Sequence, residues 1–402
     1  MKKILIASAL LGLGTQVAHA SKARLLALGQ SKDGSHFMQD TRNLFRNASY
    51  VSNAAGMAMI DFGRSAGGAG TGLDSDTAQK AEGGAFVKAG SLVYGVYLGN
   101  ESDTGVLLKS LPRGAASAAM PQSDNVLELS VAGSHSINWG ATLGWAPTKD
   151  ETVTPNKENK SLYARLGVNK DAWEAYANVS ISGESDNGAG EKYDGGGAYD
   201  VGGSYKLGEN TLYARYKTVE WDQVAASVTT KGDYKEMKLG VGHTHELSAT
   251  ARMICELTYD SVEANIKYAA GNTKGEYSQV PLIVGFEADA NSWLTLRGSI
   301  SHNLIGDAEV KNVANVANAV NRSVLAAYFK SPNAGADYKG SIGNSTNVNA
   351  GATLNFGKLS IDGLIGTGGT NGTATSGSAA SPDAGTLSLD RLMTRVSATY
   401  MF

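Results

Sequence analysis

The chain has 402 residues and a formal net charge of −3, with 50 glycines, 7 prolines and one cysteine. This near-neutral balance offers no basic footprint for a nucleic acid, and the single Cys255 excludes an intramolecular disulfide framework. After residue 20 no apolar run reaches the roughly 18 residues of a transmembrane helix, so the sequence predicts no membrane-spanning helix.

The first twenty residues have the features of a secretory signal peptide. Lys2 and Lys3 precede the apolar run 4–13, and Ala18-His19-Ala20 supplies a small-x-small cleavage pattern. We therefore expect residues 1–20 to be removed. Ser21 rather than a cysteine follows the cut, which argues against a lipoprotein anchor.

Residues 21–56 do not alternate, so we expect an N-terminal segment ahead of the first strand. Asp40 predicts the start of a brief helix that includes Phe45. The runs 23–29 and 44–48, with Asp40 between them, resemble the N-terminal pattern of the fatty-acid-transporter-like barrel superfamily, although the proline of that pattern is missing after Asn47. In that family the segment plugs the barrel, so the resemblance implies a periplasmic or lumen-located segment.

The remainder of the chain alternates between polar and apolar residues with period two, as strands that separate lipid from an aqueous lumen require. In 172–182, for example, Trp173, Ala175 and Val179 share one face, while Glu174 and Asn178 share the other. Sixteen strands are predicted near 57–64, 83–88, 92–100, 125–133, 136–146, 161–168, 172–182, 197–206, 210–221, 234–244, 249–260, 279–289, 292–302, 345–356, 358–366 and 390–402. All five tryptophans fall near the ends of these segments, which matches aromatic girdles only in part, since Trp221 and Trp293 fall on the lumen side in this register.

The connections between these segments alternate strictly between short and long. Short ones such as Gly90-Ser91 and Gly357-Lys358 are typical of periplasmic turns, and the long ones are typical of outer loops. In the longest connection, 303–344, valines recur at spacings of three and four, which predicts a short helix over about 309–328 that folds inward. The alternative is a strand over 324–329.

The polar face of the predicted strands carries charges that would cost roughly 2–4 kcal/mol each, for Arg or Lys, if they faced lipid. We therefore predict that they line a pore. They are Glu128, Arg165, Glu174, Arg215, Lys217, Lys238, Arg252, Glu256, Arg297, Asp362 and Arg395. Five of them are predicted to form a basic ladder that faces acids elsewhere on the wall: Arg215, Lys217, Lys238, Arg252 and Arg297.

No set of residues predicts an enzyme, and no cofactor is expected. His243 and His245 share one strand face and are of a type that binds metals, but they lie at a predicted turn without an evident third ligand. A plain polar turn is therefore expected there, and no metal site. Cys255 alternates with Met253 and Leu257, which places it towards lipid as a small inert side chain.

The last strand ends on Phe402, with Tyr400, Ala398, Val396 and Leu392 on the same face. This ending resembles the C-terminal signature of Gram-negative outer-membrane β-barrels. The resemblance implies recognition by the barrel-assembly machinery through Phe402, and contact with outer-membrane lipid and lipopolysaccharide.

Taken with this resemblance, the pattern predicts an all-β fold: a transmembrane antiparallel up-and-down β-barrel of about 16 strands over 57–402, in the cell outer membrane. The expected function is a porin-like channel for passive diffusion of small polar solutes and ions. The alternatives are a plugged transporter for hydrophobic ligands and a structural or adhesive barrel. Porin-like proteins often trimerise, so the resemblance also implies a homotrimer.

Overall fold

The structure is a computed structural model that describes residues 21–64, 80–100, 102, 126–152, 154–225, 227–268, 271–312, 337–341, 346–367 and 392–402. The signal peptide 1–20 and residues 313–328 of the predicted helix lie outside these residues, as does the alternative strand 324–329. Residues 309–311 of that predicted helix belong instead to a strand. Within the described ranges, no helix has the length and apolar character needed to cross a membrane.

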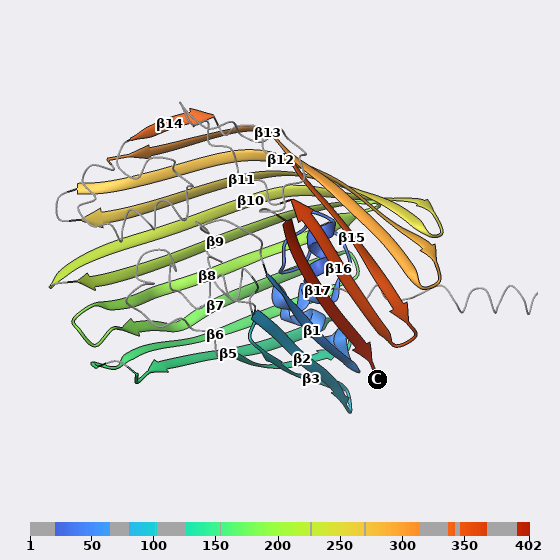
Figure 1. Ribbon diagram of the computed structural model, residues 1–402, viewed down its shortest axis with the longest axis horizontal. Helices are drawn as coiled ribbons and strands as arrows, with labels where there is room; N and C mark the ends of the chain where they lie inside the picture. The colour runs from blue at the N-terminus through green and yellow to red at the C-terminus, as the bar shows by residue number, and fades with distance from the viewer. Residues whose placement is uncertain are drawn as a thin grey trace, which may run out of the picture.

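Antiparallel strands form one continuous sheet that closes on itself (Figure 1). β1 (Met57–Arg64) pairs with β17 (Leu392–Met401), and this pairing closes the ring. β13 (Leu294–Lys311) pairs with β15 (Asn347–Phe356) through its residues 294–301. The short β14 (Tyr338–Ser341) pairs with residues 307–310 of β13, further along the same edge. Sixteen strands therefore form the barrel, which confirms the predicted fold. The others are β2 (Lys80–Ala89), β3 (Leu92–Leu98), β4 (Leu127–Ser134), β5 (Asn138–Asp150), β6 (Lys157–Lys170), β7 (Trp173–Asp186), β8 (Lys192–Leu207), β9 (Asn210–Ala225), β10 (Val228–Ser248), β11 (Ala251–Tyr268), β12 (Gly271–Asn291) and β16 (Leu359–Thr367).

Every predicted strand segment overlaps a strand of the barrel, but several strands run further from the short turns than predicted. Two connections predicted to be long, between β9 and β10 and between β11 and β12, therefore consist mostly of strand. β10, for instance, has 21 residues, whereas the alternation marked only 234–244. Past the lipid, the outward face carries residues such as Glu220, and alternation is no longer imposed. The pattern therefore marked the part of each strand that crosses the bilayer and missed the part that projects beyond it.

The barrel has an apolar exterior and a polar interior. Leu129 is 51 % exposed on the outer face, while its chain neighbour Glu128 is 1 % exposed on the inner face. Trp139, Trp145 and Trp173 also point outward, whereas Trp221 is buried towards the lumen. This inversion of a soluble protein's pattern is what a closed barrel needs in a bilayer, because its outer side chains are solvated by lipid.

Residues 21–56 lie inside the ring, drawn in blue in Figure 1, and we call this segment the plug. It contains α2 (Lys22–Ala27), η1 (Thr41–Phe45) and η2 (Ala48–Ala54), which begin at the N-caps Ser21, Asp40 and Asn47. The brief helix predicted after Asp40 is thereby confirmed as a 3₁₀ turn.

Wall glycines allow the plug to approach the strands closely. A Cβ placed on Gly140 would overlap the Ala48 carbonyl, and one on Gly167 would overlap the Asn47 side chain. The plug also packs an apolar core against the first strands, formed by Leu44, Phe45, Val51, Ala54, Met57, Met59, Phe86, Val93, Tyr97 and Ala132. The short turns lie at the same end as the plug's exit, since Met401 N–H donates to the Lys358 carbonyl and Phe402 N–H donates to the Gly56 carbonyl.

Candidate functional site

The plug is basic, and the wall that it meets supplies acids. Five of its side chains are basic (Lys22, Arg24, Lys32, Arg42 and Arg46), and two are acidic (Asp33 and Asp40). Four of the basic side chains form ion pairs with carboxylates of the wall. Buried charges are tolerated only when they are paired, so these contacts define the position of the plug.

Arg24 makes the most complete of these junctions. Its Nε and Nη2 donate to the two carboxylate oxygens of Glu287 at 2.9 and 3.0 Å, and its Nη1 donates to Asp40 at 2.6 Å. Glu287 also accepts from two wall arginines, Arg252 at 2.5 Å and Arg297 at 3.0 Å. Three guanidinium groups therefore converge on one carboxylate, and only one of them belongs to the plug.

A second junction joins the plug to the first strands of the barrel. Arg42 Nη1 donates to Asp61 at 2.8 Å and to Glu82 at 2.7 Å, and Lys22 Nζ lies 2.8 Å from the other oxygen of Glu82. Tyr97 donates its hydroxyl to Glu82 at 3.0 Å. Because β1 closes the ring against β17, this junction ties the plug to the seam of the barrel.

A third junction involves Glu174 on β7. It accepts from Arg46 Nη2 at 2.7 Å and from the Asn47 amide at 3.1 Å, and His36 Nδ1 lies 3.3 Å away. The His36 ring stacks on Tyr213 with centroids 4.4 Å apart. Burial, reinforced by the Arg46 charge, lowers the pKa of His36 to about 3, so this plug imidazole is neutral.

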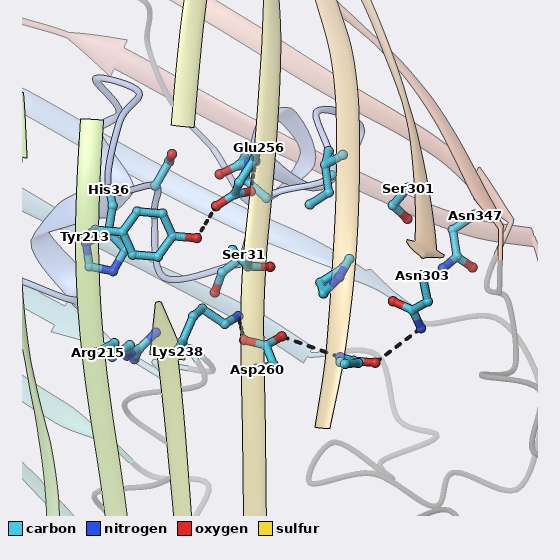
Figure 2. Close-up of a pocket in the computed structure, with 18 of the residues that line it drawn as sticks. Ser31, His36, Tyr213, Arg215, Lys238, Glu256, Asp260, Ser301, Asn303 and Asn347 are labelled. Carbon is cyan, nitrogen blue, oxygen red and sulfur yellow. Dashed lines mark hydrogen bonds and ion pairs between the residues drawn. The ribbon is translucent and has the colours of Figure 1, made fainter. Parts of the chain in front are cut away.

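A cavity of about 260 Å³ lies between the plug and the wall formed by β9–β13 and β15 (Figure 2). The plug contributes Gln30 and His36 to its lining. The Gln30 amide donates to Glu256 at 2.9 Å, and the Tyr213 hydroxyl donates to the same carboxylate at 2.5 Å. The cavity is therefore shaped jointly by the plug and the wall.

The wall side of this cavity carries both signs of charge. Lys238 Nζ lies 3.4 Å from Asp260, which also accepts from the Gln279 amide at 3.4 Å, and Gln279 accepts in turn from Asn303 at 3.2 Å. Figure 2 shows this chain of contacts crossing the strands, with Arg215 beside it. Such a surface can hold a solute that offers both hydrogen-bond donors and acceptors.

The structure places the predicted pore-lining residues on the inner face, but most of them hold the plug or each other. Glu174, Arg215, Glu256 and Arg252 belong to the junctions above or pair next to them, since Arg215 lies 3.3 Å from plug Asp33. Arg165 binds Glu128 through two contacts of 2.6 Å. Arg297 donates to Asp362 at 2.8 Å, Lys217 lies 3.3 Å from Glu236, and Arg395 is half-buried beside buried Ser397.

The predicted basic ladder was wrong. Instead of facing distant acids, each member pairs with an acid on an adjacent strand: Arg215 with Asp200, Lys217 with Glu236, Lys238 with Asp260, Arg252 with Glu287, and Arg297 with Glu287. Arg297 also reaches Asp362 on β16, two strands away across β15. Adjacent strands bring facing side chains within about 5 Å, so local pairing wins over any interaction across the lumen.

Sequence reasoning missed Asp61 and Glu82, the acids of the Arg42 junction. In β1 the inner face carries Met57 and Met59, which are buried against the plug, while the outer face carries Ile60 and Phe62. Because both faces of β1 are apolar, the alternation could not assign Asp61 to the inner or the outer face. A lone acid in a strand that is apolar on both faces was the available signal.

No protein-family model matches the chain, and no curated protein matches it. Among solved structures it is similar to a porin (10 % identity, TM-score 0.38, covering 86 % of this chain and 99 % of that one). It is also similar to the Pseudomonas putida toluene transporter TodX (11 % identity, TM-score 0.38, 97 % and 100 %) and to a Pseudomonas aeruginosa FadL homologue (11 % identity, TM-score 0.44, 97 % and 100 %).

At this level of similarity the neighbours' names say nothing about what passes through this chain. The apolar exterior, the closed ring and the short turns at the end of the termini are features of the chain itself. A closed antiparallel barrel with these features is of the outer-membrane type. The protein is an outer-membrane β-barrel whose lumen contains its own N-terminal segment.

Proposed function

We propose that the protein is an outer-membrane channel for passive diffusion of small polar solutes, closed at rest by the plug. The cavity beside the plug carries the proposal, because its lining offers Arg215, Lys238, Glu256 and Asp260 together with amide and hydroxyl groups. A hydrophobic ligand would leave these groups desolvated and partly unpaired, which is unfavourable. A polar solute would replace the water that solvates them.

The dimensions point to a small solute. The cavity's volume of about 260 Å³ falls just below the roughly 300–1,000 Å³ of sites for drug-sized ligands. The two charge signs on the wall favour a zwitterion of about the size of an amino acid or an uncharged polar molecule such as a monosaccharide. No chemical step is needed, since a concentration gradient drives the passage.

Passage through the barrel requires movement of the plug. A ring of about 16 strands leaves a lumen wide enough for an aqueous channel when it is empty. Here the plug is bound to three widely separated strands of the wall, through Glu82 on β2, Glu174 on β7 and Glu287 on β12. Opening therefore means breaking one or more of these junctions, and the channel differs in this respect from an open porin.

A second candidate is a channel for hydrophobic ligands. Towards the end opposite the short turns, the inner face of β9–β11 changes from charged to apolar, with buried Val219, Trp221, Tyr234, Val262 and Ile266. An apolar solute entering from the outside would find favourable contacts along this stretch. The polar cavity lies further along the same path.

Entry of solutes into proteoliposomes distinguishes the candidates. Solute entry is followed as swelling of the proteoliposomes. Because the swelling adds up the flux through many openings, it detects a channel that is closed most of the time. We expect glycine, serine and small sugars to enter, and we expect Lys238→Met to slow the zwitterions more than the sugars. The matched control is Lys231→Met, because Lys231 pairs with Asp222 at 3.1 Å on an exposed part of the wall away from the cavity.

The proposal is contradicted if none of the polar solutes enters while an apolar solute such as toluene binds and crosses. That outcome would transfer the assignment to the second candidate. Equal effects of Lys238→Met and Lys231→Met would show that the cavity does not determine which solutes pass.

A further inference from the structure

A group of titratable side chains lies outside the lumen, at the short-turn end of β8–β10. His243 and His245 are two residues apart on β10. They point away from the lumen, since Gly242, the residue before His243, faces inward, where a Cβ would meet the plug residue Phe37. Glu209 lies in the tight turn between β8 and β9. The sequence had suggested that the two histidines lie in a turn without a third ligand. The structure corrects both points, because they lie within β10 and a turn between two other strands supplies the carboxylate.

The distances among these three side chains match those of a metal site. Glu209 Oε2 lies 3.6 Å from His243 Nε2 and 3.3 Å from His245 Nδ1, and all ligand atoms lie within 4.8 Å of one another. Tetrahedral zinc with bonds of about 2.0–2.1 Å holds its ligands roughly 3.4 Å apart. Two of the three ligand separations are thus already close to the required value, and the third, between the two imidazole nitrogens, is within 4.8 Å.

The orientation of His243 provides an independent indication. Its Nδ1 lies 2.9 Å from the side-chain oxygen of Asn210, its register partner on β9. An amide oxygen only accepts, so in the tautomer that makes this hydrogen bond Nδ1 is the donor, which leaves Nε2, the atom nearest Glu209, to coordinate a metal. Ligating histidines in metal sites are typically oriented by such a hydrogen bond from the other ring nitrogen.

We propose that Glu209, His243 and His245 bind a divalent transition metal, with zinc as the best match, at the periplasmic rim of the barrel. Two imidazole nitrogens and one carboxylate oxygen suit zinc, copper or nickel, whereas calcium and magnesium prefer oxygen ligands. The side chains are 55 %, 35 % and 48 % exposed, so a metal ion reaches them from solvent. Three protein ligands leave one position for water, and the bound ion links the β8–β9 turn to β10.

Cobalt titration of the mature, tag-free protein in detergent tests the proposal. The protein carries Cys255→Ser, which removes the one thiol, and the probe is Co²⁺ followed by its visible spectrum, with Zn²⁺ as competitor. We expect one equivalent of four-coordinate Co²⁺ that Zn²⁺ displaces. Binding should be lost in His243→Ala and Glu209→Gln, and about tenfold or more weaker in Asn210→Ala.

The matched control is His135→Ala, which changes an exposed histidine in another short turn of the same rim. It should bind Co²⁺ as the parent does, and Zn²⁺ should raise the unfolding temperature of the parent and of this control but not of His243→Ala. Circular dichroism verifies that each variant is folded. Absence of one-equivalent binding in the folded parent, or undiminished binding in both His243→Ala and Glu209→Gln, would overturn the proposal.

Discussion

Replacing Arg24 with alanine should release the plug while leaving the barrel intact. Arg24 is buried, and it makes two hydrogen bonds with Glu287 and one with Asp40. After the substitution Glu287 still accepts from Arg252 and Arg297, so the wall carboxylate keeps two partners. The loss therefore falls on the contact between the plug and the wall and, within the plug, on Asp40, which keeps the Arg42 backbone N–H as a donor.

The magnitude follows from the type of contact. Removing one partner of a buried, hydrogen-bonded ion pair typically costs about 3–5 kcal/mol. The retained partners of Glu287 favour the lower end of this range. At about 1.4 kcal/mol per tenfold change, a loss of about 3 kcal/mol raises the ratio of released to docked plug roughly a hundredfold.

Single-channel recording in a planar bilayer measures this ratio as open probability. We expect rare openings in the parent, frequent or sustained openings in Arg24→Ala, and an intermediate level in Arg24→Lys, which keeps the charge but loses the bidentate geometry. Arg252→Ala is the matched control, since Arg252 binds the same carboxylate from the wall side. Equal open probabilities in the folded parent, Arg24→Ala and Arg252→Ala would refute the conclusion that this junction keeps the channel closed.

Three further predictions address other contacts. Gly140→Val should displace η2, raise the open probability and lower the unfolding temperature, whereas Gly363→Ala, whose Cβ meets no atom closer than 4.0 Å, should change neither. The pKa of His36 in the docked plug is lowered to about 3 from an ordinary 6.5, so the released plug binds more protons between these values, and docking should weaken as the pH falls below 6.5. Open probability should therefore rise between pH 7 and pH 4, and His36→Gln should flatten this dependence; a parent profile without a slope would contradict the reasoning. Phe402→Ala should reduce the amount of protein inserted in the outer membrane of cells without altering refolding in detergent, because the Phe402 ring is exposed and only its backbone N–H bonds to Gly56; normal insertion in cells would argue against recognition of this residue.

Two features of the barrel could be predicted from local pattern alone. Alternation in segments such as 172–182 identified strands, because lipid on one side and polar groups on the other impose a period of two on each strand separately. The short connections identified one end of the barrel, but the strict order of short and long connections did not hold, since β9 ends at Ala225 and β10 begins at Val228, and β11 ends at Tyr268 and β12 begins at Gly271. The same local rule placed Glu128 and Arg165 on the inner face, where the structure has them.

The contacts that hold the plug in the lumen were decided only by the tertiary structure. Arg24 and Glu287 are 263 residues apart in sequence, and Glu209 reaches His243 and His245 from a different hairpin. Neither contact produces a periodic pattern in the sequence, since each depends on which strands the closed ring brings together. Alternation predicts the face to which a side chain points, but its partner depends on register and closure, which are properties of the whole sheet.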